Sequence, residues 1–467
     1  MNARSPATLQ IRSLAIAANC ELSDIFQHFA HQPWAMLLDS ADGQHQDSRF
    51  DIMVAQPVAT IVSKNHINQV WQQDTASYTT SGNPLALLEQ LQSEVLGAYS
   101  ADNPHHPEFP FLAGALGYFA YDLGRYFEVL PEQHTEQYVS PDMAVGLYSW
   151  SVIKDRHTGQ FFLSWLDNYP VLSAQYFEHL SHQAGNSAKF SLTSPWQANL
   201  SESEYQQKLQ KIDAYLRAGD CYQINFAQRF SAHYQGDEWQ AFLTLKAANK
   251  APFSAFIRLP DNVIISISPE RFLALKHGNV QTKPIKGTRP RSSDPLSDEQ
   301  AKDSLFNSPK DRAENLMIVD LLRNDLSKHC EPHSVQVPNL FAIESFAAVH
   351  HLVSTVTAKL APHSNAYSLF QGAFPGGSIT GAPKIRAMQI IDELEPHKRN
   401  IYCGSIGYFG IRQDMDSSIC IRTLLCENNQ IYCWAGGGIV LDSVASEEYQ
   451  ESLDKVAKIL PLLSQLA

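Results

Sequence analysis

The stretch SAFIRLPDNVIISISPERFLALKHGNVQTKPI, residues 254–285, decides the fold class. It contains four short runs rich in β-branched and aromatic residues, which are typical of strands. The runs are Ser254–Leu259, Val263–Ser268, Arg271–Lys276 and Val280–Ile285. Only a few residues connect each run to the next, which leaves no room for the crossover helix that parallel strands need. The four strands are therefore expected to pair antiparallel.

Helices are predicted on both sides of these strands. Ser201 and Glu204 form a capping box, and Gly219 is a typical end for the helix that they begin. A second helix is expected from about Glu238 to Asn249. The other expected elements are a strand at Cys221–Phe230, a helix that begins at Ser308-Pro309, a Gly-rich loop leading into a helix at Pro383, strands between Cys403 and Trp434, and a C-terminal helix from about Ser446. Strand runs and helix runs are segregated, which predicts an α/β protein of the α+β type with large antiparallel sheets.

A polar, turn-rich segment at Ala184–Leu200 divides the chain. We expect an N-terminal region at residues 1–190 and a second region at residues 195–467. The strands expected in the first region include Ala35–Leu38 and Ala144–Ile153. Its Gly-rich stretch Phe111–Arg125 indicates backbones that approach closely within a sheet.

The composition favours an ordinary globular protein of the cytoplasm. Hydrophobic residues make up 44% of the chain, which allows a sizeable core. No run approaches the roughly 20 apolar residues that span a bilayer, and the N-terminus lacks the pattern of a secretory signal. The seven cysteines include no CxxC pair, which favours reduced thiols over disulfides or a metal site built from sulfur. No membrane contact is expected.

The net charge restricts the possible partners. A formal charge of −13 without a basic stripe argues against binding to nucleic acid. An anionic substrate would have to bind against this overall field. Local positive groups or a bound cation would then be needed.

A carboxylate and an amine, Glu270 and Lys286, are predicted to face each other across a hairpin. If His277-Gly278-Asn279 forms a hairpin turn centred on Gly278, residues whose numbers sum to twice 278 face each other, and Glu270 lies opposite Lys286. Such a pair can be an acid–base group beside a nucleophilic amine. It can also be a surface salt bridge, which the pattern alone favours.

Two predicted helices carry clusters of carboxylates. Asp311 and Glu314 share one face at i, i+3, and Glu447, Glu448 and Glu451 lie close together near the C-terminus. Oxygen ligands without sulfur suit Mg²⁺. Solvated acidic faces are the alternative, and the pattern alone favours them.

Two further segments could contact an anion. The loop FPGGSITGAPK, residues 374–384, precedes a helix, and a helix N-terminus is a ready anion site. Ala382 stands where a nucleotide-binding loop requires Lys, so a carboxylate-bearing ligand or a tight packing turn remains. Arg422 is expected inside the apolar strand Ile419–Thr423. There it must pair with an internal carboxylate or clamp a ligand.

Taken in this order, the motifs closely resemble those of the chorismate-utilising enzymes. The motifs are Gly219–Gln223, Ser268–Glu270, Pro284–Thr288, Asp311–Met317, Val319–Leu321, Arg323–Asp325, His350–Ser354, Phe374–Lys384, Ile421–Thr423 and Glu448–Glu451. The resemblance continues in the first region at Trp34–Ser40, Ser48–Asp51 and Ala115–Arg125, so it covers nearly the whole chain. It implies two antiparallel sheets packed as a sandwich with helices outside.

The resemblance implies chorismate as the substrate and Mg²⁺ as the cofactor. The implied metal ligands are Glu314 and Glu451, with Glu448 as an additional or outer ligand. The implied substrate-binding residues are Thr288, Thr380, Tyr408, Arg422, Gly436, Gly437 and Gly438. Mg²⁺ and Arg422 would supply the positive field that a dicarboxylate needs. His351 would lie near the leaving hydroxyl, and a structural core histidine is the alternative for it.

Within this family, the residue at position 286 discriminates between activities. Members that form anthranilate resemble Pro-Ile-Ala-Gly-Thr at this motif, whereas members that aminate C4 carry Lys, as this chain does at Lys286. The implied product is 4-amino-4-deoxychorismate, on the route to p-aminobenzoate and folate. In the implied mechanism Lys286 adds at C2 while Glu270 protonates the leaving C4 hydroxyl, and ammonia then enters at C4. The alternatives are anthranilate or isochorismate synthesis, or a catalytically silent homologue that binds chorismate.

Ammonia is expected to come from a partner. The chain has no Gly-x-Cys-x-Gly elbow, since Gly219-Asp220-Cys221 continues into Tyr222-Gln223. No cysteine is therefore placed as the nucleophile of a glutaminase. We expect a separate glutamine amidotransferase subunit that forms a heterodimer with this chain.

The resemblance also implies an amino-acid pocket in the first region. By analogy tryptophan would occupy it, with a regulatory or a structural role. The residues implied are Leu38, Ser40, Asp47, Ser48, Arg49, Phe50, Pro252, Phe253 and Ser254. Asp39 departs from the family's frequent Glu, so a vestigial pocket is expected as readily as a working one.

Overall fold

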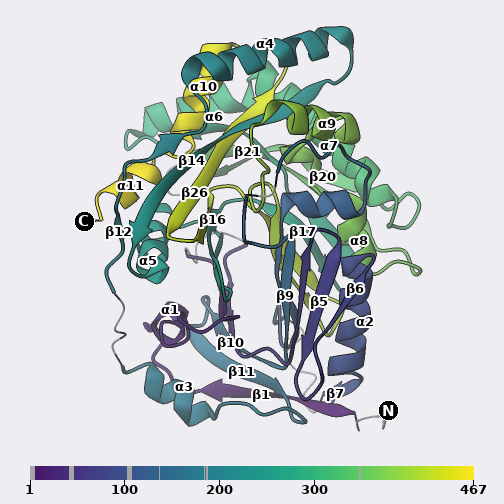
Figure 1. Ribbon diagram of the computed structural model, residues 1–467, viewed down its shortest axis with the longest axis vertical. Helices are drawn as coiled ribbons and strands as arrows, with labels where there is room; N and C mark the ends of the chain where they lie inside the picture. The colour runs from purple at the N-terminus through teal and green to yellow at the C-terminus, as the bar shows by residue number, and fades with distance from the viewer. Residues whose placement is uncertain are drawn as a thin grey trace.

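Two large sheets form the centre of the protein, and helices cover their outer sides (Figure 1). The computed structural model describes residues 6–41, 47–101, 108–135, 137–183, 185, 188–345 and 349–466. One buried cluster combines side chains of both sheets, among them Ile52 and Ile61, so the sheets pack face to face. Among the strand pairs of the described residues, β1–β7 is parallel and the others are antiparallel. The predicted fold class, with its sandwich of antiparallel sheets, is confirmed.

The first sheet has 14 strands. In spatial order they are β12 (Ser191–Leu192), β14 (Gln223–Gln235), β26 (Gln430–Ile439), β25 (Thr423–Glu427), β16 (Val263–Ser268), β15 (Phe253–Arg258), β2 (Met36–Asp39), β3 (Phe50–Val54), β10 (Trp150–Asp155), β11 (Gln160–Leu166), β1 (Ala7–Leu14) and β7 (Tyr99–Ala101), while β13 (Gln197–Ala198) and β22 (Gly381–Ala382) also pair with β14.

The second sheet has 12 strands. Their order is β19 (Ile285–Pro290), β21 (Val349–Lys359), β18 (Asn279–Thr282), β17 (Arg271–Lys276), β24 (Met415–Ile419), β23 (Ser405–Gly410), β8 (Gly114–Phe119), β9 (Met143–Tyr148), β4 (Ala59–Lys64), β5 (Ile67–Gln72) and β6 (Tyr78–Ser81), and β20 (Gln336–Ser345) also pairs with β21. Both sheets contain strands from before and after residues 184–200, because β2 pairs with β15 and β8 pairs with β23.

The helices begin and end close to the residues that their caps predict. They are α1 (Leu22–Phe26), α2 (Pro84–Leu96), α3 (Ala174–Leu180), α4 (Glu202–Ala218), α5 (Glu238–Asn249), α6 (Pro295–Phe306), α7 (Pro309–Ser327), α8 (Ala366–Ala373), α9 (Lys384–Leu394), α10 (Ala445–Asp454) and α11 (Leu460–Ser464), with 3₁₀ turns η1 (Tyr121–Tyr126) and η2 (Gly377–Ile379). Ser201 and Glu204 form the predicted capping box of α4, and Gly219 ends it in the left-handed conformation. The single predicted C-terminal helix is divided into α10 and α11, with Pro461 in the first turn of α11.

Two strand predictions were wrong, because residues that were expected to pair or to form one strand lie in different sheets. The run Val263–Ser268 is β16 of the first sheet, whereas Arg271–Lys276 is β17 of the second. Pro269 between them has no N–H to continue a ladder. The predicted strand Ala144–Ile153 is likewise divided at Ser149 into β9 and β10, which lie in different sheets.

The hairpin register was also wrong by one residue. Leu275 pairs with Val280 and Lys276 with Asn279, so paired numbers sum to one less than predicted. The turn therefore has two residues, His277 and Gly278, both with positive φ. In addition, the pairing ends at Ala274, and Lys286 lies in β19, opposite Leu352 of β21.

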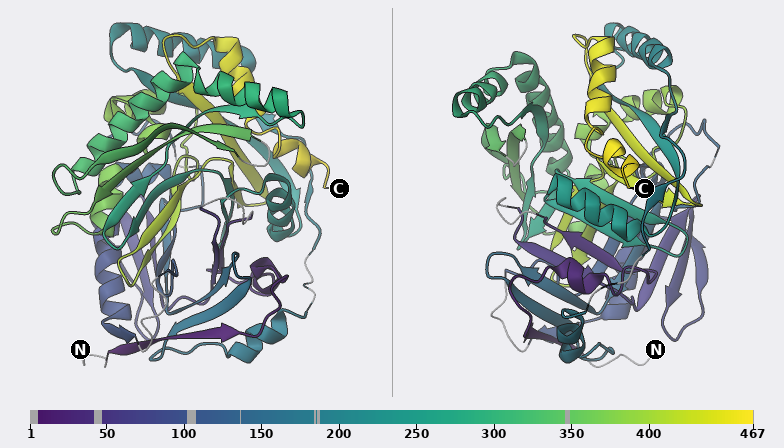
Figure 2. Two further views of the ribbon diagram at one scale, coloured as in Figure 1. Left: turned by 180° about the vertical axis from the view of Figure 1, so that it is seen from behind. Right: turned by 90° about the vertical axis from the view of Figure 1, so that its left-hand side faces the viewer.

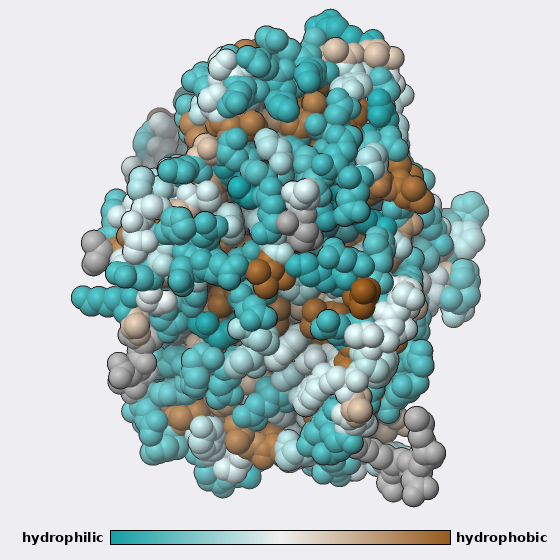
Figure 3. All heavy atoms as spheres, viewed as in Figure 1, coloured by the Kyte–Doolittle hydropathy of each residue, from teal (hydrophilic) through white to brown (hydrophobic). Residues whose placement is uncertain are grey.

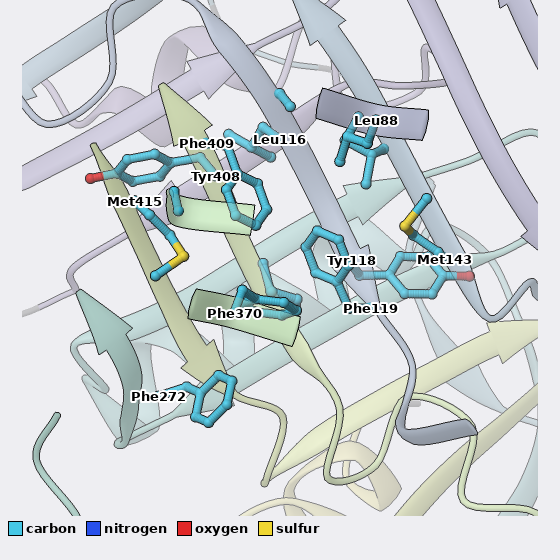
Figure 4. Close-up of a cluster of buried hydrophobic side chains, with 14 of the residues drawn as sticks. Leu88, Leu116, Tyr118, Phe119, Met143, Phe272, Phe370, Tyr408, Phe409 and Met415 are labelled. Carbon is cyan, nitrogen blue, oxygen red and sulfur yellow. The ribbon is translucent and has the colours of Figure 1, made fainter. Parts of the chain in front are cut away.

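Aromatic side chains of the core pack against Phe272 of β17 and hold this strand in place. Phe272, near the start of β17, has its ring 5.6 Å from that of Phe370 on α8 (Figure 4). The Phe370 ring in turn lies 4.8 Å from Phe119 on β8 and 5.6 Å from Phe409 on β23. All four side chains are nearly inaccessible to solvent. The core therefore fixes the backbone two residues after Glu270.

The surface is largely polar on the face seen in Figure 1. The face in Figure 3 is mostly hydrophilic, with scattered apolar side chains rather than one continuous patch. Within the described ranges, no helix is long and apolar enough to cross a membrane.

Candidate active site

A cavity of about 670 Å³ brings together most of the predicted site residues. One wall is formed by β19, β21 and the start of α7, and the other by α10 and β26. In the right-hand view of Figure 2, the arm with α6 and α7 and the arm with the C-terminal helices stand on opposite sides of the upper end. The predicted residues that line the cavity are Glu270, Lys286, Thr288, Glu314, His351, Arg422, Gly436, Gly437, Gly438, Glu448 and Glu451.

Glu270 and Lys286 share this cavity, although not through the predicted hairpin. Glu270 is 5% exposed, and its carboxylate accepts a hydrogen bond from the Ser378 hydroxyl at 3.3 Å. Lys286 Nζ donates to the backbone carbonyl of Ser378 at 3.0 Å. The two side chains are thus held by neighbouring atoms of one loop residue.

The environment weakens the charge on both groups. Burial raises the pKa of Glu270 to about 7, although the nearby Lys286 opposes the rise. Burial also lowers the pKa of Lys286, against the attraction of Glu314 and Glu270. A proton can therefore pass between the amine and the carboxylate at a much smaller free-energy cost than in water.

His351 is placed on β21 in the cavity wall. Its Nδ1 lies 2.8 Å from the hydroxyl of Thr288 on β19, and the side chain is nearly inaccessible to solvent. The hydrogen bond orients the ring, so two predicted residues act as a unit.

The three predicted metal ligands lie on two helices. Glu314 is on α7, and Glu448 and Glu451 are on α10. Each α10 carboxylate has a lysine partner: Lys310 lies 3.5 Å from Glu448, and Lys455 lies 2.7 Å from Glu451. In the part of the chain that the structure describes, no group of three or more His, Cys, Asp or Glu is close enough to hold a metal ion as it stands.

The chemistry of these carboxylates nevertheless fits Mg²⁺. Burial raises the pKa of Glu314, and the negative charges of Asp311 and Glu448 add to the rise. Burial opposes ionisation of Glu451, but Lys455 and Lys310 outweigh it and its pKa is lowered. A hard divalent cation would relieve the repulsion among these oxygens.

Arg422 occupies a different backbone environment from the predicted one. It lies between β24 and β25 rather than inside a strand, with φ 52°, and its carbonyl accepts from the N–H of Ile267. Burial lowers its pKa, and no carboxylate forms an ion pair with it among the described residues. Of the two predicted possibilities, the absence of an internal partner favours a ligand clamp.

The glycines of β26 line the cavity next to the carboxylates of Glu448 and Glu451. A Cβ at Gly436 would lie 2.1 Å from the carbonyl oxygen of Phe226 on β14, so no side chain fits there. A Cβ at Gly437 would come within 3.3 Å of Glu448 and 3.5 Å of Glu451. Glycine therefore leaves the backbone of β26 accessible beside the carboxylate cluster.

Two predicted substrate-binding residues lie outside this cavity. Tyr408 on β23 lines a second cavity instead. The Thr380 hydroxyl donates to the Gly376 carbonyl and closes the loop rather than facing the cavity. The alternation of side chains along β23, which depends on long-range pairing, decides which way Tyr408 points.

Sequence reasoning did not predict a role for several residues of the cavity lining, among them Tyr402, Ser378 and Lys455. Tyr402 precedes β23 and stacks on Trp434 at 6.3 Å between ring centroids. Ser378 belongs to the predicted anion loop, and the i, i+4 spacing of Lys455 from Glu451 is a signal that could have indicated it.

The second cavity, of about 970 Å³, corresponds to the predicted amino-acid pocket. Its lining includes Leu38, Ser40, Asp47, Arg49, Phe50, Pro252, Phe253 and Ser254, whereas Ser48 is buried and does not line it. Arg271 in its wall pairs with Asp47 at 2.5 Å and Asp416 at 3.0 Å. The identity of any occupant stays a prediction.

The chain belongs to the family of chorismate binding enzymes, whose family model matches residues 33–461. Among its relatives, aminodeoxychorismate synthase component 1 of Klebsiella aerogenes is 53% identical over 93% of this chain and 95% of that protein. The protein of the same name from Escherichia coli K12 is 51% identical over 94% of this chain and 95% of that protein.

Solved structures show the same architecture. Anthranilate synthase component I from Streptococcus pneumoniae has a TM-score of 0.77 at 30% identity, covering 90% of this chain and 95% of that one. The menaquinone-specific isochorismate synthase of Escherichia coli has a TM-score of 0.70 at 18% identity, covering 99% and 97%, which shows a shared fold.

Proposed function

We propose that this chain aminates chorismate at C4 and forms 4-amino-4-deoxychorismate, on the route to p-aminobenzoate and folate. One observation carries the proposal: an amine, Lys286, lies in the cavity beside a buried carboxyl group, Glu270. The names of the relatives with just over half of their residues identical support it.

The amination would proceed in two displacements. A proton first passes from Lys286 to Glu270, which gives a neutral amine and a carboxylic acid. Lys286 then bonds to C2, the ring double bonds shift, and the C4 hydroxyl leaves as water with the proton of Glu270. Ammonia bonds to C4, the double bonds shift back, and Lys286 leaves C2 as a neutral amine. Because two displacements follow one another, the product keeps at C4 the configuration that chorismate had.

The remaining residues would bind and orient the substrate. Arg422 and the backbone of Gly436–Gly438, which line the cavity, are proposed to hold the enolpyruvyl carboxylate. His351, oriented by Thr288, is proposed to lie at the leaving hydroxyl.

A metal ion would complete the site. Glu314 and Glu451 would hold Mg²⁺, with Glu448 as a further ligand. The bound ion would neutralise the ring carboxylate of chorismate. This local positive charge would offset the net charge of −13 of the protein.

The source of ammonia is proposed to be a separate glutamine amidotransferase subunit that forms a heterodimer with this chain in the cytoplasm. The words "component 1" in the names of the relatives support the existence of a partner. The lack of a glutaminase elbow in this sequence supports its identity.

The proposal is tested by incubating the purified chain with chorismate, Mg²⁺ and ammonium chloride and identifying the product by chromatography and mass spectrometry. The expected product is 4-amino-4-deoxychorismate. Anthranilate or isochorismate as the product would assign the chain to another activity of the family. Chorismate recovered unchanged, with binding seen by calorimetry, would indicate a silent homologue.

A further inference from the structure

Ser378 contacts both members of the catalytic pair through different atoms. Its hydroxyl donates to Glu270 at 3.3 Å, and its backbone carbonyl accepts from Lys286 Nζ at 3.0 Å. The residue is 7% exposed and lies in the short turn η2, between α8 and α9. A single turn therefore determines the separation of the acid and the amine.

Buried hydrogen bonds hold this turn in place. The carbonyl of Ile379, the next residue, accepts from Arg399 Nη1 at 2.9 Å and from Asn225 Nδ2 at 3.0 Å. Arg399 is 2% exposed and forms a bidentate pair with Glu395, at 2.6 and 2.9 Å. Because Asn225 lies on β14 and Glu395 directly follows α9, the turn is anchored to two elements outside it.

The hydroxyl suits a carboxyl group that changes its protonation state. A serine hydroxyl donates to an ionised carboxylate and can rotate to accept from the protonated acid. The same contact can thus hold Glu270 before and after it receives a proton. An amine that donates one N–H to the Ser378 carbonyl also keeps its lone pair directed away from that carbonyl.

We propose that Ser378 is a positioning residue of the amination, which holds Glu270 and Lys286 at the distance and orientation that proton exchange and attack on the substrate require. The inference rests on the proposed roles of Glu270 and Lys286. It adds a function for a loop residue that does not itself exchange a proton or form a bond with the substrate.

If Ser378 has this positioning role, its replacement should change the pH dependence of kcat/KM as well as the rate. The Ser378 hydroxyl lowers the pKa of Glu270 against the larger effect of burial, so its loss should raise that pKa further. Below the pKa of Glu270 the pair carries two protons and Lys286 stays charged, so the acid limb of kcat/KM should move to higher pH. The other charged groups that act on the pair are Glu314 on α7, Glu451 on α10 and Lys455 directly after α10, and the substitution leaves them in place.

The test compares Ser378→Ala with Ser378→Thr, which keeps the hydroxyl, and with Ser151→Ala. Ser151 is a buried serine on β10 that lines neither cavity, and its hydroxyl bonds to the Phe111 and Leu112 carbonyls. Rates are measured with chorismate and ammonium from pH 5.5 to 9, and folding is checked by thermal unfolding.

For Ser378→Ala, kcat should fall roughly 10- to 100-fold with little change in KM, as misplaced reacting groups do. The acid limb should shift upward by about 0.5–1 pH unit, since a hydrogen bond to a charged group is lost. Ser378→Thr should have the acid limb of the kcat/KM profile at the wild-type pH. Ser151→Ala should lower thermal stability without shifting this limb.

A wild-type kcat and acid limb in Ser378→Ala, or a change confined to KM, would overturn the inference. If Ser378→Ala does not fold, Ser378→Cys, which is close in size, takes its place, and failure of both would make Ser378 a structural residue. The Lys286→Ala variant distinguishes a failure of the proposed amination mechanism from a failure of the proposed role of Ser378. If that variant still aminates chorismate, the proposed mechanism fails; if it is inactive while Ser378→Ala behaves as wild type, only the role of Ser378 fails.

Discussion

Replacing Glu270 by Gln should stabilise the protein at alkaline pH while ending amination. Burial raises the pKa of the Glu270 carboxyl from 4.5 to about 7. A carboxyl whose folded pKa lies above its unfolded value costs stability when ionised, and this cost grows between the two pKa values and is complete above pH 7. A shift of about 2.5 units corresponds to about 3.4 kcal/mol.

The net gain should be smaller than this figure. Gln cannot offset the charge of Lys286, which then has Glu314 and Glu451 as its nearest opposite charges. We therefore expect about 2 kcal/mol at pH 8. With an unfolding entropy of about 2.1 cal/mol/K per residue, this is a rise of Tm by about 2 °C. At pH 5 the carboxyl is largely protonated in the folded state, and the rise should stay below about 1 °C.

The assay is thermal unfolding of wild type and Glu270→Gln at pH 5 and pH 8, with product formation measured on the same samples. Glu202→Gln, which removes an exposed carboxylate at the start of α4, serves as the control and should change Tm little at either pH. A lower Tm for Glu270→Gln at pH 8, or an equal gain at both pH values, would refute the reasoning. A lower Tm would mean that the folded protein stabilises the ionised carboxylate, and an equal gain would mean that the stabilisation does not depend on its ionisation.

The other predictions concern the nucleophile, the metal, the ammonia source and the second cavity. Lys286→Ala should bind chorismate but lose most amination, Lys286→Arg should fail too because guanidinium stays charged, and digestion after incubation without ammonia should reveal a modified Lys286 in the wild type; near-normal product from Lys286→Ala would eliminate the covalent step. Glu314→Gln and Glu451→Gln should keep Tm within a few degrees but lose Mg²⁺ binding by calorimetry, and full activity in excess EDTA would contradict the metal assignment. The isolated chain should use ammonium salts and not glutamine, which glutamine-dependent turnover would disprove. By the family analogy tryptophan is the expected occupant of the second cavity if that pocket is not vestigial, and no heat of tryptophan binding at millimolar concentration would count against a working pocket.

Local signals predicted the helices near the site well. Ser308 caps α7 by accepting from the N–H of Asp311, as its position before Pro309 predicted. Helix α5 has the predicted bounds Glu238–Asn249. These features depend on residues within one turn of each other, so the sequence contains all the information needed. These local signals predict which face of α7 carries Glu314, but not which residue Glu314 contacts.

The errors concern contacts between distant segments. The predicted hairpin would have joined Glu270 to Lys286 through one ladder, whereas the ladder ends at Ala274 and Lys286 belongs to β19, paired with β21. The two groups meet because Ser378, which follows Lys286 by 92 residues and Glu270 by 108, contacts both. A one-residue change of register inverts the direction of every side chain, so local pattern could not decide which of the two cavities Tyr408 faces. Family motifs predicted residues that line the candidate site, and the pairing of the two sheets determines how they face one another. For this reason the contacts of Ser378 with both members of the proposed catalytic pair became visible only in three dimensions.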